Sequence, residues 1–155
     1  MKRKRILCCT LIALNLALIF GNSAMPGSTS TGISDGFLSL LQGAIPGLGS
    51  VTSFLIRKLA HFSEFTCLGL LLGRMFRLLG FRGFPAFTSP AFFGILAACT
   101  DETIQYFVPG RDSNLIDVWI DVCGVFTGIL FLFLGYFCIG RRSKQKKDKP
   151  SGGTL

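Results

Sequence analysis

Four long apolar stretches constrain what this chain can fold into. They cover residues 6–20, 54–79, 85–107 and 115–139, and charged or glycine-rich segments separate them. A helix needs about 20 mostly apolar residues to cross a bilayer, and the first stretch reaches that length when it is extended to Met25. With 50% hydrophobic and 15% charged residues, the chain is too apolar for an ordinary soluble domain of 155 residues. The sequence therefore predicts an all-α integral membrane protein, built as an antiparallel four-helix bundle.

The basic residues lie at the ends of these stretches. Lys2–Arg5 precedes the first stretch, Arg74, Arg77 and Arg82 surround the connection after the second, and six more lie within 141–149. Because basic segments stay in the cytoplasm, this distribution predicts a multi-pass protein with both termini there and the lipid bilayer as its partner. A net charge of +8 could also indicate nucleic-acid binding, but that needs a basic face on a soluble fold, so no nucleic-acid partner is expected.

The two ends of the chain have distinct compositions. The first residues are basic, an apolar stretch follows, and small residues come next, which is typical of a signal peptide or of a first transmembrane helix. We expect an uncleaved helix here, and we expect Gly140 to end the last span. The chain then divides into a first transmembrane helix or uncleaved signal anchor at 1–25, an external loop at 26–53, a three-span core at 54–140 and a basic cytoplasmic tail at 141–155.

The external loop is rich in Gly, Ser and Thr, and Asp35 is its only charged residue. Ser34 or Asp35 can cap a short amphipathic helix, with Phe37 and Leu40 on one face, before Pro46 ends it. Such a helix would lie on the outer membrane surface, although a plain packed loop helix fits the same pattern.

Five of the eight acidic residues fall between positions 97 and 121, at the junction of two apolar stretches. Because acidic side chains are costly to bury in a membrane, this concentration indicates a polar site where helix ends meet. A rise of about 1.5 Å per residue puts Glu64, Asp101 and Asp121 each roughly 10 Å from the outer start of its helix. Three helices therefore deliver a carboxylate to one layer, and His61 lies one turn from Glu64.

Two helical faces in this region have matching patterns. Gly94, Ala98, Asp101 and Gln105 share one face of the third span, and Asp117, Asp121, Gly124 and Gly128 share one face of the fourth. Both faces are polar toward the outside and small toward the inside. Since a short turn joins these spans, we expect the two faces to pack against each other.

Ordinary structural roles compete with function at several of these positions. Asn114 and Asp117 have the spacing of a capping box, so Asp117 can equally serve only to start its helix. Asp112 is interpreted as a turn residue. His61 is equally consistent with a packed, hydrogen-bonded histidine and with a chemical role beside Glu64.

The acids of this region outnumber the cations available to pair with them. Against six carboxylates the region offers the fixed charges of Arg57, Lys58 and Arg111, so some carboxylates must be protonated, hydrated or bound to a cation. No recognised cofactor or metal motif is present and no cofactor is predicted, yet the excess leaves a divalent metal as an open alternative. Its candidate ligands are His61, Glu64, Asp101 and Asp121.

Three segments of this sequence resemble the VanZ-like family of bacterial membrane proteins: Arg57–Phe65, Asp101–Arg111 and Asp117–Gly124. The resemblance implies a small integral protein of the bacterial plasma membrane, related to one that raises resistance to the glycopeptide teicoplanin. Carried over by position, it implies that the characteristic polar site residues are Lys58, His61, Glu64, Asp101, Glu102, Gln105, Arg111, Asp117 and Asp121. Two departures stand out. Phe65 replaces a tyrosine that the family often has, and Phe20–Ala24 replaces a Phe-Ser-Ser-Gln-like element.

Two functional hypotheses follow, and the residues leave open whether the chain is an enzyme. In the first, an outward-facing polar pocket engages an envelope lipid, a lipid-linked wall precursor or a partner protein, with Arg111 and Lys58 suited to an anionic headgroup. In the second, the acids and His61 form a membrane-embedded, metal-dependent enzyme acting on a lipid-linked substrate. A proton-coupled transporter is disfavoured, because no acid lies near mid-span.

Overall fold

The computed structural model describes residues 2–44, 52–111 and 113–147. These residues form five helices and no strand, which confirms the all-α prediction. The helices are α1 (Lys2–Ser23), α2 (Gly27–Ala44), α3 (Ser53–Leu79), α4 (Pro85–Tyr106) and α5 (Leu115–Lys147).

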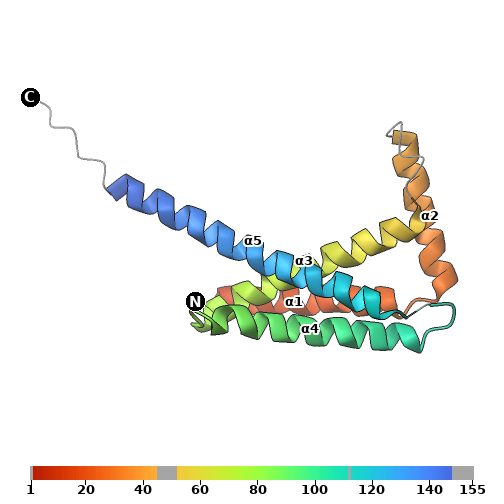
Figure 1. Ribbon diagram of the computed structural model, residues 1–155, viewed down its shortest axis with the longest axis horizontal. Helices are drawn as coiled ribbons and strands as arrows, with labels where there is room; N and C mark the ends of the chain where they lie inside the picture. Colours follow the sequence, from red (N-terminus) through yellow and green to blue (C-terminus); the bar gives the residue numbers. More distant parts are fainter. Residues whose placement is uncertain (1, 45–51, 112, 148–155) are drawn as a thin grey trace, which may run out of the picture.

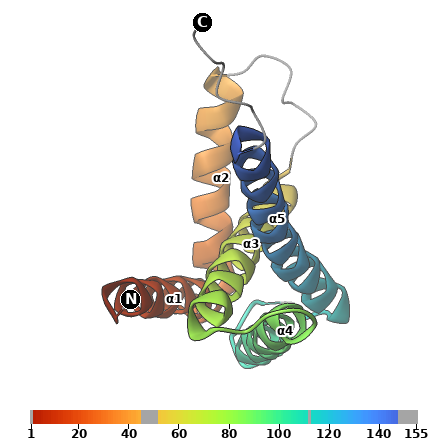
Figure 2. The ribbon, with the colours of Figure 1, turned by 90° about the vertical axis from the view of Figure 1, so that its left-hand side faces the viewer.

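Four of these helices pack together, and α2 stands away from them at one end (Figure 1). Helices α3 and α5 cross each other, and the view along the long axis shows α3 between α1 and α5 (Figure 2). The side chains at the centre of this packing come from all four packed helices. They include Ile19 of α1, Phe65 and Leu68 of α3, Ala98 of α4 and Val125 and Ile129 of α5.

The contacts at the helix ends define two different ends of the molecule. The Arg5 guanidinium donates to the Leu78 carbonyl from Nε at 3.1 Å and from Nη2 at 2.8 Å, so the start of α1 lies beside the end of α3. At the opposite end, the Gly27 amide donates to the Pro109 carbonyl at 3.2 Å and joins the start of α2 to the α4–α5 loop. The basic residues near the first end are thus separated from the acids of the α4–α5 junction.

Among the described residues, two helical segments are long and apolar enough to cross a membrane by length and composition, namely Lys2–Ser23 and Leu115–Cys138. Helices α3 and α4 do not meet this test, because charged groups lie within them, such as Glu64 in α3 and Asp101 in α4. Large apolar side chains nevertheless face outward from all four packed helices. Examples are Leu14 of α1, Leu59 of α3, Phe92 of α4 and Phe131 of α5. An apolar exterior of this extent is typical of a surface that meets lipid or a partner.

Small residues set the spacing between the helices, as predicted. A Cβ on Gly69 of α3 would overlap the Val125 backbone carbonyl, and a Cβ on Gly128 of α5 would overlap that of Thr66. The predicted partner was wrong, however. Gly124 and Gly128 lie against α3 rather than α4, because Val125, the residue after Gly124, turns toward α4 and packs on Gly94.

Two helix boundaries differ from the prediction. Helix α2 begins at Gly27, so Ser34 and Asp35 lie inside it instead of capping it. Its hydroxyl groups fold back onto their own helix: Thr31 Oγ1 donates to the Gly27 carbonyl at 2.9 Å and Ser34 Oγ to the Ser30 carbonyl at 3.0 Å. A segment rich in Ser and Thr therefore forms helix where a loop was expected.

Helix α5 also continues past Gly140 and ends at Lys147, within the predicted tail. A single glycine costs a helix only about 1 kcal/mol, and the Lys, Arg and Gln residues that follow favour helix. The rest of the predicted tail, from residue 148, and the predicted helix end at Pro46 both lie outside the described residues.

Candidate functional site

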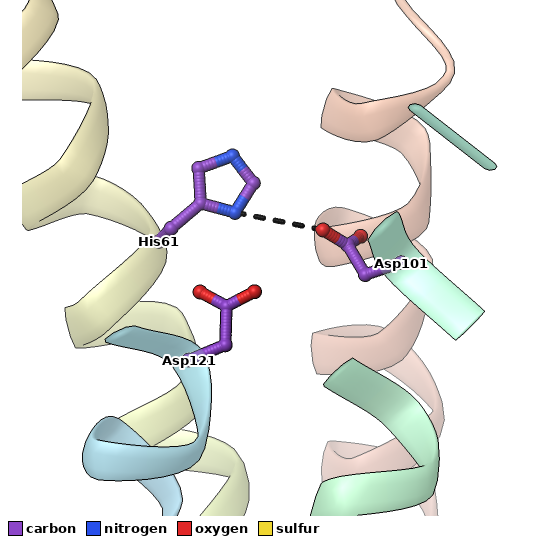
Figure 3. Close-up of side chains that lie close together, drawn as sticks. All are labelled: His61, Asp101 and Asp121. Carbon is purple, nitrogen blue, oxygen red and sulfur yellow. Dashed lines mark ion pairs between the residues drawn. The ribbon is translucent and has the colours of Figure 1, made fainter. Parts of the chain in front are cut away.

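Three helices bring one polar side chain each to a common point. His61 extends from α3, Asp101 from α4 and Asp121 from α5, and their side chains point toward one another (Figure 3). One ligand atom from each residue lies within 4.8 Å of the other two, and His61 Nδ1 is 3.7 Å from Asp101 Oδ2. Asp101 is 0% exposed and Asp121 is 2% exposed. The expected meeting of Asp101 and Asp121 at one level is therefore found.

The inner part of this cluster has few hydrogen-bond partners. Gln105, one turn after Asp101 on α4, donates from Nε2 to Asp101 Oδ2 at 2.9 Å, and the same nitrogen lies 3.4 Å from Ser23 Oγ of α1. Asp101 Oδ1, Asp121 Oδ2 and His61 Nδ1 are buried without a hydrogen-bond partner among the described residues. Three neighbouring polar atoms are thus left unsatisfied in one small volume.

Glu64 lies outside this cluster and faces the end of α1. Asn22 donates from Nδ2 to Glu64 Oε1 at 2.6 Å, while Glu64 Oε2 is buried and unpaired within the described part of the chain. Glu64 also lines a cavity of about 120 Å³ together with Arg57, His61 and Arg111. Of the four candidate metal ligands, the structure thus brings three together. The fourth, Glu64, lines this cavity of about 120 Å³ beside the cluster.

Glu102 fastens the α4–α5 loop to the end of α4. Its Oε1 accepts a hydrogen bond from the backbone amide of Asn114 at 2.6 Å, and Ser113 Oγ donates to the backbone carbonyl of Glu102 at 3.3 Å. Because the Asn114 amide is used in this way, the predicted capping box with Asp117 does not form; Asn114 Oδ1 instead accepts from the Ile116 amide at 3.1 Å. Asp112 lies outside the described residues.

Asp117 forms an ion pair with Lys58 of α3, so it does more than start its helix. The Lys58 ammonium also lies 4.9 Å from the centre of the Phe54 ring, a distance at which a cation is attracted to the ring face. This pair links α5 to the first turns of α3 at the rim of the site.

Two arginines lie beside each other near the cluster. Arg111 donates from Nε to the Met25 carbonyl at 3.2 Å and from Nη2 to the Asn22 carbonyl, so it satisfies carbonyl groups at the end of α1. Arg57 Nη1 donates to Thr31 Oγ1 of α2 at 3.3 Å. Burial, and then the nearby charge of Arg57, lower the pKa of Arg111 from its ordinary value. Since arginine is ordinarily charged at any physiological pH, Arg57 and Arg111 form a positively charged surface beside the cluster.

A polar cavity of about 270 Å³ opens beside these groups. Of the nine predicted site residues, six line it, whereas Asp101 lies behind it, Glu64 lines the adjoining cavity and Glu102 holds the loop. The six are Lys58, His61, Gln105, Arg111, Asp117 and Asp121.

Sequence reasoning missed the contributions from α1 and α2. Asn22 and Ser23 contact Glu64 and Gln105, and Thr31 contacts Arg57. A usable signal existed for the first two, since they are polar residues directly after an apolar stretch, within the Phe20–Ala24 segment where the resemblance departs.

A third cavity, of about 520 Å³, continues from this polar region between α2 and α3 and has a mainly apolar lining that includes Phe37, Leu41, Ile56 and Leu59. The three cavities adjoin one another, because neighbouring cavities share lining residues. The first and second share Arg57, His61 and Arg111, and the second and third share Ile33, Ser34 and Ala60. The polar site is thus followed by an apolar groove.

Comparison with known proteins identifies one family. The family model described as VanZ/LLP1 matches residues 7–136, which is most of the chain and includes every described residue of the polar site. No curated protein and no solved structure matches the chain.

Proposed function

This chain belongs to the VanZ/LLP1 family, and from that premise we propose that it is an integral membrane protein of the bacterial envelope that binds an anionic lipid. The lipid headgroup would enter the polar cavity, and its hydrocarbon chain would lie in the groove between α2 and α3. A phosphate-bearing envelope lipid or lipid-linked wall precursor has this chemistry.

The proposed arrangement in the membrane is an antiparallel bundle in which α1, α3, α4 and α5 each cross, with both termini in the cytoplasm. The apolar side chains facing outward from all four helices support it, and so do the basic residues Lys2–Arg5 and Arg82, which belong to one end. The polar cavity then opens on the outer side, where α2 covers it along the membrane surface.

The observation that carries the ligand proposal is the series of adjoining cavities. A volume of about 270 Å³ is too small for a whole lipid but suits a compact headgroup. Arg57, Lys58 and Arg111 line it, and an arginine fork matches the oxygens of a phosphate. The apolar groove shares lining residues with the second cavity and would accept the hydrocarbon chain of the same lipid.

Binding of purified protein to defined lipids tests this proposal. A polyprenyl phosphate and phosphatidylglycerol serve as the two anionic probes and diacylglycerol as the neutral one, with complexes detected by native mass spectrometry. Arg57→Gln should weaken anionic binding roughly 10-fold or more, because a hydrogen bond to a charged group contributes about 1.5–3 kcal/mol. Arg82→Gln removes the same charge from an exposed position at the opposite end and serves as control.

Preference between the two anionic probes identifies the class of lipid. Stronger binding of the polyprenyl phosphate assigns a wall precursor carrier, and stronger binding of phosphatidylglycerol assigns a membrane phospholipid. Headgroup recognition would be refuted if diacylglycerol bound as strongly as the anionic lipids, or if Arg57→Gln bound the anionic lipids as strongly as the wild-type chain.

The cellular consequence we propose is altered susceptibility to glycopeptides such as teicoplanin, which act on wall precursors at the outer face of the plasma membrane. Cells expressing the chain should be less susceptible, and Arg57→Gln should remove that effect at equal membrane abundance. If Arg57→Gln abolishes lipid binding and leaves susceptibility unchanged, the link to resistance fails while the lipid proposal stands.

A second candidate function is a membrane-embedded enzyme acting on the same lipid-linked substrate. The clustering of His61, Asp101 and Asp121 beside the cavity favours it, since acids and an imidazole in contact with a bound ligand can transfer protons. Chromatographic detection of a product from the bound polyprenyl-phosphate ligand, absent with Asp121→Asn, would support it; binding without turnover would exclude it for that substrate.

A further inference from the structure

We infer that His61, Asp101 and Asp121 bind one divalent metal ion beside the polar cavity. Each residue comes from a different helix, and one ligand atom of each lies within 4.8 Å of the others (Figure 3). One imidazole and two carboxylates are a ligand set that holds divalent metals in proteins. The metal site does not depend on headgroup binding.

An independent observation supports a ligand at this point. Asp101 and Asp121 are 0% and 2% exposed, yet Asp101 Oδ1 and Asp121 Oδ2 have no hydrogen-bond partner among the described residues. His61 Nδ1, which faces them, is also unsatisfied. Buried polar atoms without partners cost free energy, so one such atom on each of the three clustered residues indicates a missing bound group.

The contacts of the nearby fixed positive charges are with groups other than Asp101 and Asp121. Lys58 pairs with Asp117, and Arg111 donates to the carbonyls of Met25 and Asn22. Arg57 donates to Thr31 of α2. No lysine or arginine among the described residues forms an ion pair with Asp101 or Asp121. A divalent cation would supply the charge that these carboxylates lack.

The ligand set favours a first-row transition metal or zinc over calcium. Calcium takes about six to eight oxygen ligands, whereas zinc accepts three protein ligands and leaves a coordination position for water or substrate. In tetrahedral coordination with bonds of about 2.1 Å, ligand atoms lie about 3.4 Å apart. Ligand atoms that are farther apart than this, within the observed limit of 4.8 Å, would have to move inward. His61 and Asp121 also line the cavity, so an open position would face an anionic ligand there.

Metal content of the purified full-length chain tests this inference. The chain carries an affinity tag without histidine, and the probes are Zn²⁺ and, separately, Co²⁺, whose visible absorption reports imidazole and carboxylate coordination. After incubation and desalting, the wild-type chain should retain about one equivalent of metal. Asp121→Asn and Asp101→Asn should each lower metal affinity at least 10-fold, and His61→Gln should change the Co²⁺ spectrum.

Glu102→Gln is the matched control. It removes the same charge from the residue next to Asp101, and its retained Oε1 can still accept from the Asn114 amide. This variant should retain its metal. Gel filtration and helical circular dichroism confirm that each variant is folded.

Three outcomes would overturn the metal site: no stoichiometric metal on the folded wild-type chain, retention by folded Asp121→Asn, or an equal loss with Glu102→Gln. The lipid-binding measurement uses other residues and another readout, so failure of the metal site and failure of the proposed function are distinguishable.

Discussion

Glu64 depends on a side chain from another helix. Asn22 of α1 donates to Glu64 Oε1 at 2.6 Å, and Glu64 Oε2 has no partner in the described chain. Asn22→Ala would leave this carboxylate without its hydrogen bond, which costs about 1–3 kcal/mol of unfolding free energy. Thermal unfolding in detergent should show this loss, and Asn22→Ala combined with Glu64→Gln should recover part of it. Additive losses in this double-mutant cycle would mean that the hydrogen bond contributes nothing.

At the residue scale, the sequence predicted which polar residues belong to the site and how far they lie from the outer helix starts. It predicted few of their hydrogen-bond partners. The depth of Asp101 and Asp121 follows from the helical rise, so their meeting with His61 could be expected. The contacts of Asn22 with Glu64 and of Ser23 with Gln105 join positions 42 and 82 residues apart, and no local pattern encodes them. The resemblance indicated that the Phe20–Ala24 segment matters without indicating what it touches.

At the element scale, the contact between α3 and α5 depends on glycine. A Cβ on Gly128 would overlap the Thr66 carbonyl oxygen and lie 2.7 Å from the Leu70 amide nitrogen, so the two helices would have to separate. Gly128→Ala should destabilise the protein by about 1–3 kcal/mol, as overpacking of a core does. Gly135→Ala on the same helix meets nothing within 4 Å and should be neutral or slightly stabilising. Equal melting temperatures of the two variants would show that this contact is not tight.

Helix positions could be predicted from apolar runs because a bilayer-length helix leaves a long local signal. The predicted starts of the second, third and fourth spans lie within one residue of α3, α4 and α5. The neighbour of α5 could not be predicted, since a shared helical face says nothing about which helix covers it. The predicted α2 was too short, because the hydroxyl groups of Thr31 and Ser34 donate to backbone carbonyls of the same helix and the helix continues through them.

At the scale of the whole molecule, the two ends differ in charge. Arg5 lies beside Leu78 at one end, while Asp101, Asp117 and Asp121 lie toward the other, near the end of α4 and the starts of α3 and α5. The positive-inside rule counts Lys and Arg near the helix ends, so the first end should remain in the cytoplasm and the polar cavity should open outward. Any even number of crossings keeps both termini on one side, and the proposed arrangement has four.

Fusions of alkaline phosphatase, which is active only outside the cytoplasm, test this orientation. A fusion after residue 44 should be active, because α1 would carry it across, and a fusion after Arg82 should be inactive, because α3 would return the chain. Green fluorescent protein at the carboxyl terminus should fluoresce, since it folds in the cytoplasm. Replacing Arg74, Arg77 and Arg82 with Gln removes positive charge from the α3–α4 connection and should raise phosphatase activity after position 82. Strong activity after Arg82 in the unaltered chain would contradict the proposed topology, because the polar cavity and the basic end would then have exchanged sides.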